Sequence, residues 1–359
     1  MNGRPQPGRH LYGWIDSFRN SWAVAKPGRV SEMIYYLFLS LTSRLLGFWR
    51  RLYDRPLAAP TAREVMLVEN FRFALQEDPT PRSPDLSPSE KAWTEFGKRL
   101  RDLVMGDDPR RFLRWDVIRK TMFVGSSLYV ARELKYLKRR PDWESRWKPV
   151  LREDSCGHPK PYFLYPASSA NLIHHAYHLC QMEEKTGLSI DQVNLVVEFG
   201  GGYGGMCRLV HRFGFKGTHV IYDLPTFSAL QQFYLQSLGL TPVRTAPFAG
   251  HENGPGAILA SATNDIRQLL SSMAPTRSAF IATWSLSEAP VPVRQEILNL
   301  VSGFDLFLIA YQERFGEVDN RQFFEGWKPA LADRVDWQEW EIEHLPGSRY
   351  LIGSARIGR

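Results

Sequence analysis

A dense group of glycines lies in the second half of the chain. Residues 196–205 read VVEFGGGYGG, an apolar stretch typical of a strand, followed by a glycine-rich turn and the start of a helix. Glycine has no Cβ, so the backbone of such a turn can approach a ligand closely and direct amide N–H groups and the helix N-terminus at it. The segment therefore predicts a turn that cradles a cofactor.

The glycines match two cofactor motifs at once. Positions 200, 202 and 205 have the G-x-G-x-x-G spacing of dinucleotide enzymes, and positions 198–204 have the acidic-x-G-x-G-x-G spacing of enzymes that use S-adenosylmethionine. Glu198 ends the first strand, where a carboxylate can meet the ammonium group of the methionine moiety. A dinucleotide site normally has an apolar residue there, so Glu198 favours S-adenosylmethionine. We expect the cofactor to contact Glu198, Gly200, Gly202, Tyr203 and Gly204.

Polar side chains also follow the next two predicted strands. Asp223 ends the strand 218–222, where its two oxygens can accept hydrogen bonds from both ribose hydroxyls. This position suits either cofactor, so it supports nucleoside binding without choosing between them. Asn264 and Asp265 follow the third strand, where such folds usually contact the adenine ring. A helix N-cap explains either residue equally well.

Candidates for the acceptor side come from the segment TWSLSEAP (283–290), which follows a fourth predicted strand. Open α/β proteins bind ligands at this carboxyl end of the sheet. Methyl transfer to an alcohol requires the acceptor oxygen to be held in line and its proton to be removed. Glu288 can orient or deprotonate a hydroxyl, and Trp284 can either stack on a sugar face or fill the core.

Three histidines precede the first strand on a predicted helix. His174 and His178 lie one turn apart on the same face, and His175 lies next to them. A histidine here can act as a base at neutral pH, while packing or surface exposure explains any one of them equally well. We favour His175 or His178 as the base and place His174 with the acceptor-binding residues. We expect no metal site, since spacing places no third ligand beside these histidines.

Four runs resemble one known family: EFGGGYGG (198–205), VIYDLP (220–225), TWSLSEAP (283–290) and RYLIGSAR (349–356). They look like the sugar O-methyltransferases, a branch of the class I methyltransferases with a Rossmann-like core. The resemblance covers about residues 160–356. It implies a hydroxyl of a sugar, or of a glycosylated or nucleotide-linked sugar, as the methyl acceptor. It also implies that the cofactor is held by Glu198, Gly200, Gly202 and Asp223, and that Ser285 and Glu288 lie at the rim of the acceptor pocket.

The sequence around these motifs predicts an α/β fold. Short apolar strands alternate with helices after residue 195, which is the pattern of a mainly parallel sheet with helices on both faces. The first half reads as mainly helical, with helices at 87–105, 112–123, 128–137 and 169–185. We therefore expect an irregular arm (1–30), a mainly helical N-terminal domain (31–165) for acceptor recognition or oligomerisation, and an S-adenosylmethionine-binding methyltransferase domain (166–359).

Composition narrows the choice of partners and compartment. The net charge is +7, with the excess of Lys and Arg in the N-terminal half. The interleaving of aromatic and basic residues that is typical of a nucleic-acid groove is faint and confined to Trp143, Arg146, Trp147 and Lys148. We expect a small-molecule or glycan acceptor and no nucleic acid. The apolar segment 33–43 is too short to span a membrane, and we favour its docking on the second domain or a second subunit over peripheral membrane contact. Three scattered cysteines predict a cytoplasmic protein without disulfides.

Two other functions remain open on these residues. An NAD(P)-dependent sugar oxidoreductase or epimerase would use the same glycine turn, but the Tyr-x-x-x-Lys proton donor of such enzymes does not occur in the second half. A protein that binds the cofactor without catalysing a reaction would have the same glycine turn.

Overall fold

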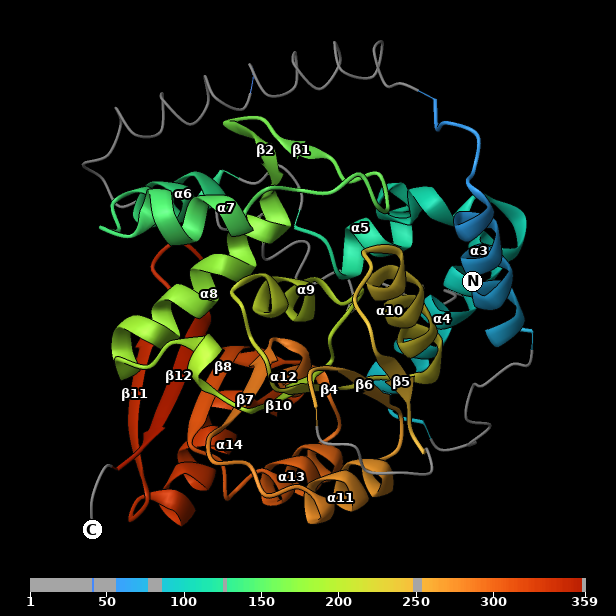
Figure 1. The fold of residues 1–359 in the computed structure, drawn as a ribbon. Coiled ribbons are helices and arrows are strands. Elements are labelled where there is room, and N and C mark those ends of the chain that lie inside the picture. The colour runs from blue at the N-terminus through green and yellow to red at the C-terminus, as the bar shows by residue number, and fades with distance from the viewer. Residues whose placement is uncertain (1–40, 42–55, 77–85, 125–127, 248–253, 357–359) are drawn as a thin grey trace, which may run out of the picture.

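The computed structural model describes residues 41, 56–76, 86–124, 128–247 and 254–356. The predicted arm (1–30) and nearly all of the apolar segment 33–43 lie outside these residues. The main feature is a sheet of eight strands in the order β11-β12-β8-β7-β3-β4-β6-β5. Its neighbours pair in parallel, except that β12 runs antiparallel to both β8 and β11. The sheet runs through the lower half of the molecule in Figure 1.

The first half of the sheet is built around the predicted strand–turn–helix unit. Strand β3 (Leu195–Phe199) is buried along its whole length and leads through the glycine turn into α9 (Gly205–Arg212). The strands on either side of this unit are β4 (Thr218–Tyr222), β5 (Val243–Thr245), β6 (Gly256–Ala260) and β7 (Ser278–Thr283). The sheet is completed by β8 (Leu306–Gln312), β11 (Val335–Glu341) and β12 (Ser348–Ala355).

Helices cover both faces of the sheet. On one face, apolar side chains of α8 (Ala170–Thr186) and α9 pack in one cluster with alternate residues of the central strands, and those of α10 (Pro225–Ser237) pack beside β4 and β6. On the other face lie α11 (Thr263–Ser272), α13 (Val291–Leu300) and α14 (Asn320–Trp327). Figure 1 shows α11 and α13 below the sheet and α8, α9 and α10 above it.

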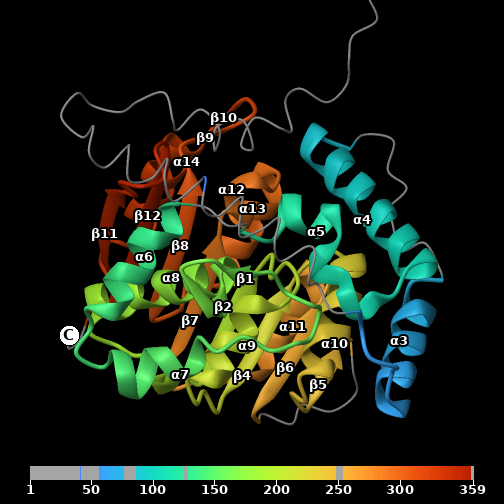
Figure 2. The same cartoon turned by 90° about the horizontal axis from the view of Figure 1, so that it is seen from above.

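The N-terminal half is helical and packs on the first of these faces. Its helices are α3 (Ala62–Ala74), α4 (Pro88–Gly106), α5 (Asp116–Thr121), α6 (Tyr129–Lys138) and α7 (Lys148–Val150), followed by the hairpin β1 (Pro161–Tyr162) and β2 (Tyr165–Ser169). Side chains of α3 and α4 share a core cluster with α10, as in the stacked rings of Phe71 and Phe233. Figure 2 shows α3, α4 and α5 beside α10.

Caps define the ends of two helices as predicted. Ser87 and Glu90 form a reciprocal capping box at the start of α4, with Pro88 at the first helical position. Ser169 caps α8 through the amide of Leu172. Gly187 ends the same helix in the left-handed conformation, at φ +70°.

Two expectations about elements were wrong. The segment 112–123 was expected to be one helix, but Trp115 has extended backbone angles and separates a short 3-10 helix (Pro109–Arg114) from α5. The indole N–H of Trp115 donates to Asp107 at 3.0 Å, which fixes the break. Strands β5 and β11 were not expected; β11 alternates buried and exposed residues with acidic side chains, as an edge strand does.

The strand order confirms the predicted fold class. Parallel strands on either side of β3, with helices on both faces and a reversed β12 inserted beside β8, make a Rossmann-like α/β fold. The mainly helical N-terminal half precedes it as expected. Within the described ranges, every helix is too short or too polar to cross a membrane.

Candidate cofactor and acceptor site

The glycine turn after β3 has the backbone conformation that its sequence requires. Gly200 and Gly202 have φ angles of +71° and +58°, in the left-handed region that only glycine adopts readily. A Cβ on Gly200 would lie 2.3 Å from the Cβ of Ser285, which follows β7. Neighbouring segments therefore close around this turn, and a side chain at position 200 would push them apart.

Asp223 is bound to the glycine turn. Its Oδ2 accepts hydrogen bonds from the amide of Gly202 at 3.1 Å and from Nε2 of Gln231 at 2.8 Å, and its Oδ1 accepts the amide of Leu224 at 2.8 Å. A carboxylate has about four acceptor sites, so one on Oδ1 stays free for a ligand hydroxyl. Burial raises the pKa of Asp223 to about 7, even though these three donors act against the shift.

Glu198 lies beneath the turn on the same side of the sheet as His219 of β4. His219 Nε2 lies 2.9 Å from Glu198 Oε2, and both side chains are almost completely buried. Burial raises the pKa of Glu198 to about 8 and lowers that of His219 to about 3, so both groups tend towards their neutral forms. A cationic ligand group at this carboxyl would favour its ionised form.

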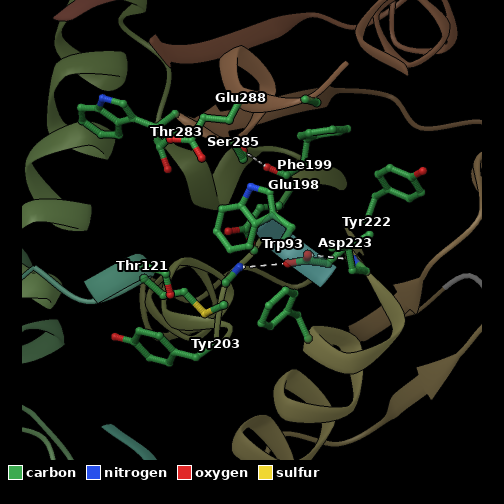
Figure 3. A pocket seen from close by; sticks show the side chains of 18 of the residues that line it. Trp93, Thr121, Glu198, Phe199, Tyr203, Tyr222, Asp223, Thr283, Ser285 and Glu288 are labelled. Carbon is green, nitrogen blue, oxygen red and sulfur yellow. Dashed lines mark hydrogen bonds between the residues drawn. The ribbon is translucent and has the colours of Figure 1, made fainter. Parts of the chain in front are cut away.

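A cavity of about 770 Å³ joins the turn to the acceptor candidates. Figure 3 shows Glu198 and Asp223 on one side of it and Thr283, Ser285 and Glu288 on another, with Trp93 from α4 between them. The volume lies in the range of small-molecule and cofactor sites. The lining residues that were predicted from the sequence are Glu198, Gly200, Gly202, Tyr203, Asp223, His174, His175, His178, Trp284, Ser285 and Glu288.

Glu288 is a buried carboxyl at the wall of this cavity. Its carboxyl lies at the cavity wall at the end of α12 (Ser285–Glu288) and is only 8% exposed. Gln312 Nε2 donates to its Oε1 at 3.2 Å. Burial raises its pKa to about 7, although Gln312 and the positive charge of Arg294 act against the shift. Such a carboxyl titrates near the pH at which a general base is most effective.

Trp284 is held in a strained conformation at the cavity wall. Its φ is +65°, which is a costly angle for a residue with a Cβ and is found mainly at functional sites. The indole ring stacks on His174, with ring centroids 5.4 Å apart, and contacts His178 at 5.1 Å. One edge of the indole thus packs against the core while the residue also lines the cavity.

The histidines of α8 belong to a hydrogen-bonded network below Trp284. His174 Nδ1 lies 2.8 Å from buried Glu133 and its Nε2 lies 3.0 Å from His178 Nε2, while His178 Nδ1 pairs with the hydroxyl of Tyr350. Both nitrogens of His174 and His178 are therefore engaged. His175 Nε2 lies 3.1 Å from Asn171 Nδ2, and burial lowers the pKa of His175 to about 3. Their positions support a structural role more than proton removal.

Several predicted residues are arranged differently from what a direct ligand contact requires. The Ser285 hydroxyl donates to the carbonyl of Phe199 and so fixes the end of β3. The Tyr203 hydroxyl accepts from Asn171 at 2.7 Å, within an aromatic cluster. Gly204 is absent from the residues that line the cavity, as are Asn264 and Asp265. Neither Asn264 nor Asp265 is the N-cap either, because Ala262 takes that position in α11.

Residues from distant parts of the chain complete the site, and the sequence motifs did not indicate them. Gln231 of α10 is fully buried and joins Asp223 to the carbonyl of Gly202, at 3.0 Å. Trp93 and Met122 come from the helical half and face the turn. Gln231 lies on α10, eight residues after Asp223, and no motif in the sequence pointed to it.

Comparison with known proteins yields distant structural matches. No protein-family model and no curated protein sequence matches the chain. The mitomycin 7-O-methyltransferase is 11% identical over 91% of this chain and 100% of its own, with a TM-score of 0.33. An O-methyltransferase family protein from Burkholderia thailandensis is 13% identical over 90% and 99%, with a TM-score of 0.36. A 16S rRNA methylase is 12% identical over 62% and 98%, with a TM-score of 0.30. Likeness at this level assigns no substrate, and the fold is assigned from the strand order above.

Proposed function

We propose that the protein is an S-adenosylmethionine-dependent O-methyltransferase that acts on a hydroxyl of a sugar or of a glycosylated or nucleotide-linked sugar. One observation carries the proposal: a left-handed glycine turn lies between the buried carboxyl of Glu198 and the half-buried carboxyl of Asp223, and all three face the same cavity as a third carboxyl with a pKa of about 7. The fold supplies the frame in which such a turn holds this cofactor.

The residues at the turn fit the two ends of the cofactor. The Glu198 carboxyl is buried, and among the described residues its side-chain partner is His219. It would hold the ammonium group of the methionine moiety. Asp223 keeps one acceptor site on Oδ1 and would hold a ribose hydroxyl. S-adenosylmethionine would supply a methyl group that its sulfonium already activates.

The protein's own contribution is to position the acceptor and remove its proton. Glu288 would accept the proton of the hydroxyl at its free carboxylate oxygen, since Oε1 is held by Gln312. Trp284 presents a flat ring at the same wall, which suits the apolar face of a sugar. The sugar itself is proposed from the family resemblance of the four sequence runs.

The compartment follows from the cysteines. Cys156, Cys180 and Cys207 are all free thiols in the structure. Free thiols are typical of a reducing compartment, so we propose the cytoplasm as the site of action.

Calorimetric titration against S-adenosylmethionine, S-adenosylhomocysteine and NAD tests the cofactor. We expect both sulfur compounds to bind with one site per chain and NAD to give no heat. Binding of NAD alone would overturn the proposal in favour of an oxidoreductase. Transfer of a radiolabelled methyl group to a panel of sugars, nucleotide sugars and phenols then tests the acceptor, and labelling of phenols alone would reject the sugar.

A further inference from the structure

A cluster of three potential metal ligands lies directly behind the glycine turn. Cys207 and His211 are one turn apart on α9, and His219 projects from β4. Their nearest sulfur and nitrogen atoms all lie within 4.8 Å of one another. A tetrahedral zinc ion holds its ligand atoms roughly 3.5 Å apart, so small side-chain rotations would bring all three into coordination.

One ring nitrogen of each histidine in this cluster lacks a hydrogen-bond partner among the described residues. Nε2 of His211 and Nδ1 of His219 are buried and unpaired among the described residues. A buried polar atom without a hydrogen-bond partner lowers the free energy of unfolding by roughly 1–3 kcal/mol. Two such atoms in one cluster therefore indicate a place where a ligand can bind. Cys207 is fully buried and free, and its thiol lies beside both rings.

The second nitrogen of His219 is arranged as in known metal sites. His219 Nε2 lies 2.9 Å from the Glu198 carboxyl. Histidines that bind metals usually donate their other N–H to a carboxylate, which fixes the tautomer and the direction of the ring. A metal ion at Nδ1 of His219 would select the tautomer that donates to Glu198. The cluster thus has three possible metal ligands and a carboxyl, that of Glu198, which can hydrogen-bond to one of them.

We propose that Cys207, His211 and His219 form a zinc-type metal site that ties α9 to β4. One thiolate and two imidazoles are ligands that favour Zn²⁺ over Mg²⁺ or Ca²⁺. The site lies behind the turn that cradles the cofactor, so an ion here would hold α9, whose first residue is Gly205, against the sheet. The proposal stands independently of methyl transfer. The sequence did not predict it because Cys207 and His219 lie on different elements.

The first experiment uses untagged full-length protein purified without chelators. We expect one zinc ion per chain by mass spectrometry of the metal content. After removal of the metal and addition of Co²⁺, we expect a thiolate-to-cobalt charge-transfer band in the near ultraviolet. The absence of both bound zinc and this band in the wild-type protein would overturn the proposal.

Matched variants assign the ligands. Cys207→Ser should abolish the cobalt band and weaken zinc binding at least about 100-fold, whereas Cys156→Ser, outside the cluster, should leave both unchanged. His211→Asn removes a half-buried ligand from the helix and should weaken zinc binding as Cys207→Ser does, while any Co²⁺ that still binds keeps its thiolate band. An unchanged cobalt band in Cys207→Ser, or equal losses in Cys207→Ser and Cys156→Ser, would contradict the site. Circular dichroism of each variant separates loss of metal from loss of fold.

Discussion

Replacement of Glu288 by Gln should make the protein more stable and less active at the same time. The carboxyl is buried, so its ionised form is disfavoured and its pKa lies at about 7 rather than 4.5. Glutamine has the same shape and carries no charge. Its side-chain oxygen can still accept the hydrogen bond from Gln312. The substitution therefore removes the cost of charge burial and leaves the packing unchanged.

The size of the effect follows from the pKa. One pKa unit corresponds to about 1.4 kcal/mol, so holding this carboxyl ionised in the folded protein costs roughly 3 kcal/mol of the free energy of unfolding above pH 7. Below the ordinary pKa of 4.5 the group is protonated in both folded and unfolded chains, and the cost vanishes. The cost grows between these two values as the pH rises.

Chemical denaturation at two pH values measures this difference. We expect Glu288→Gln to raise the free energy of unfolding by about 3 kcal/mol at pH 8 and by less than about 0.5 kcal/mol at pH 4.5. Glu296→Gln is the matched control, because Glu296 is 38% exposed and pairs with Arg267 at the surface. Its effect should stay within about 0.5 kcal/mol at both pH values.

The same variant tests the role of Glu288 in catalysis. Loss of a general base lowers the rate roughly 10²- to 10⁴-fold, and the wild-type rate should rise with pH through about 7 as Glu288 ionises. Equal stabilisation at both pH values, or none at pH 8, would refute the charge-burial argument. Full activity in Glu288→Gln would refute its role as base.

Three further substitutions test the cofactor cradle. Asp223→Asn should weaken S-adenosylmethionine binding about tenfold or more in calorimetry, because a ribose hydroxyl loses a charged acceptor; unchanged affinity would place the ribose elsewhere. Gln231→Leu should weaken the same affinity several-fold, because the donor that orients Asp223 is lost, and an affinity equal to that of the wild type would contradict this role. Gly200→Ala should lower the free energy of unfolding by about 2 kcal/mol or more in chemical denaturation, because the added Cβ would clash with Ser285. Gly214 also has a positive φ but has open space around it, so Gly214→Ala should lower the free energy of unfolding by about 1 kcal/mol. Equal losses in the two variants would show that backbone strain, and not the clash with Ser285, causes the effect.

The core of the fold could be predicted because its signals are local. Strand β3, helix α9 and strand β4 have the bounds that the sequence indicated, since each strand is a compact apolar run followed by Gly200 or Asp223 and the helix starts at the last glycine of the turn. Strand β11 could not be predicted in the same way. It pairs on one side only and alternates Trp337 and Trp340 with acidic residues, a pattern that resembles a surface loop in sequence.

The site could be predicted only where one motif holds the residues together. Glu198 and Asp223 were found because each ends a strand next to the glycine turn. The role of Gln231 depends on which face of α10 meets the turn, and tertiary packing decides that. The positions of Asn264 and Asp265 were inferred from fold position alone, and the cavity does not reach them.

The hydrogen bond from the Ser89 hydroxyl to the carbonyl of Glu288, at 2.6 Å, joins the helical half to the wall that carries the base. Through this bond and Trp93, helix α4 forms one wall of the cavity in which the acceptor would lie. Under the proposed function, residues of both halves would therefore surround the acceptor, with Glu288 on one wall and helix α4 on another. Substitutions in α4 should accordingly change the shape of the acceptor side of the cavity and leave Glu198 and Asp223 in place.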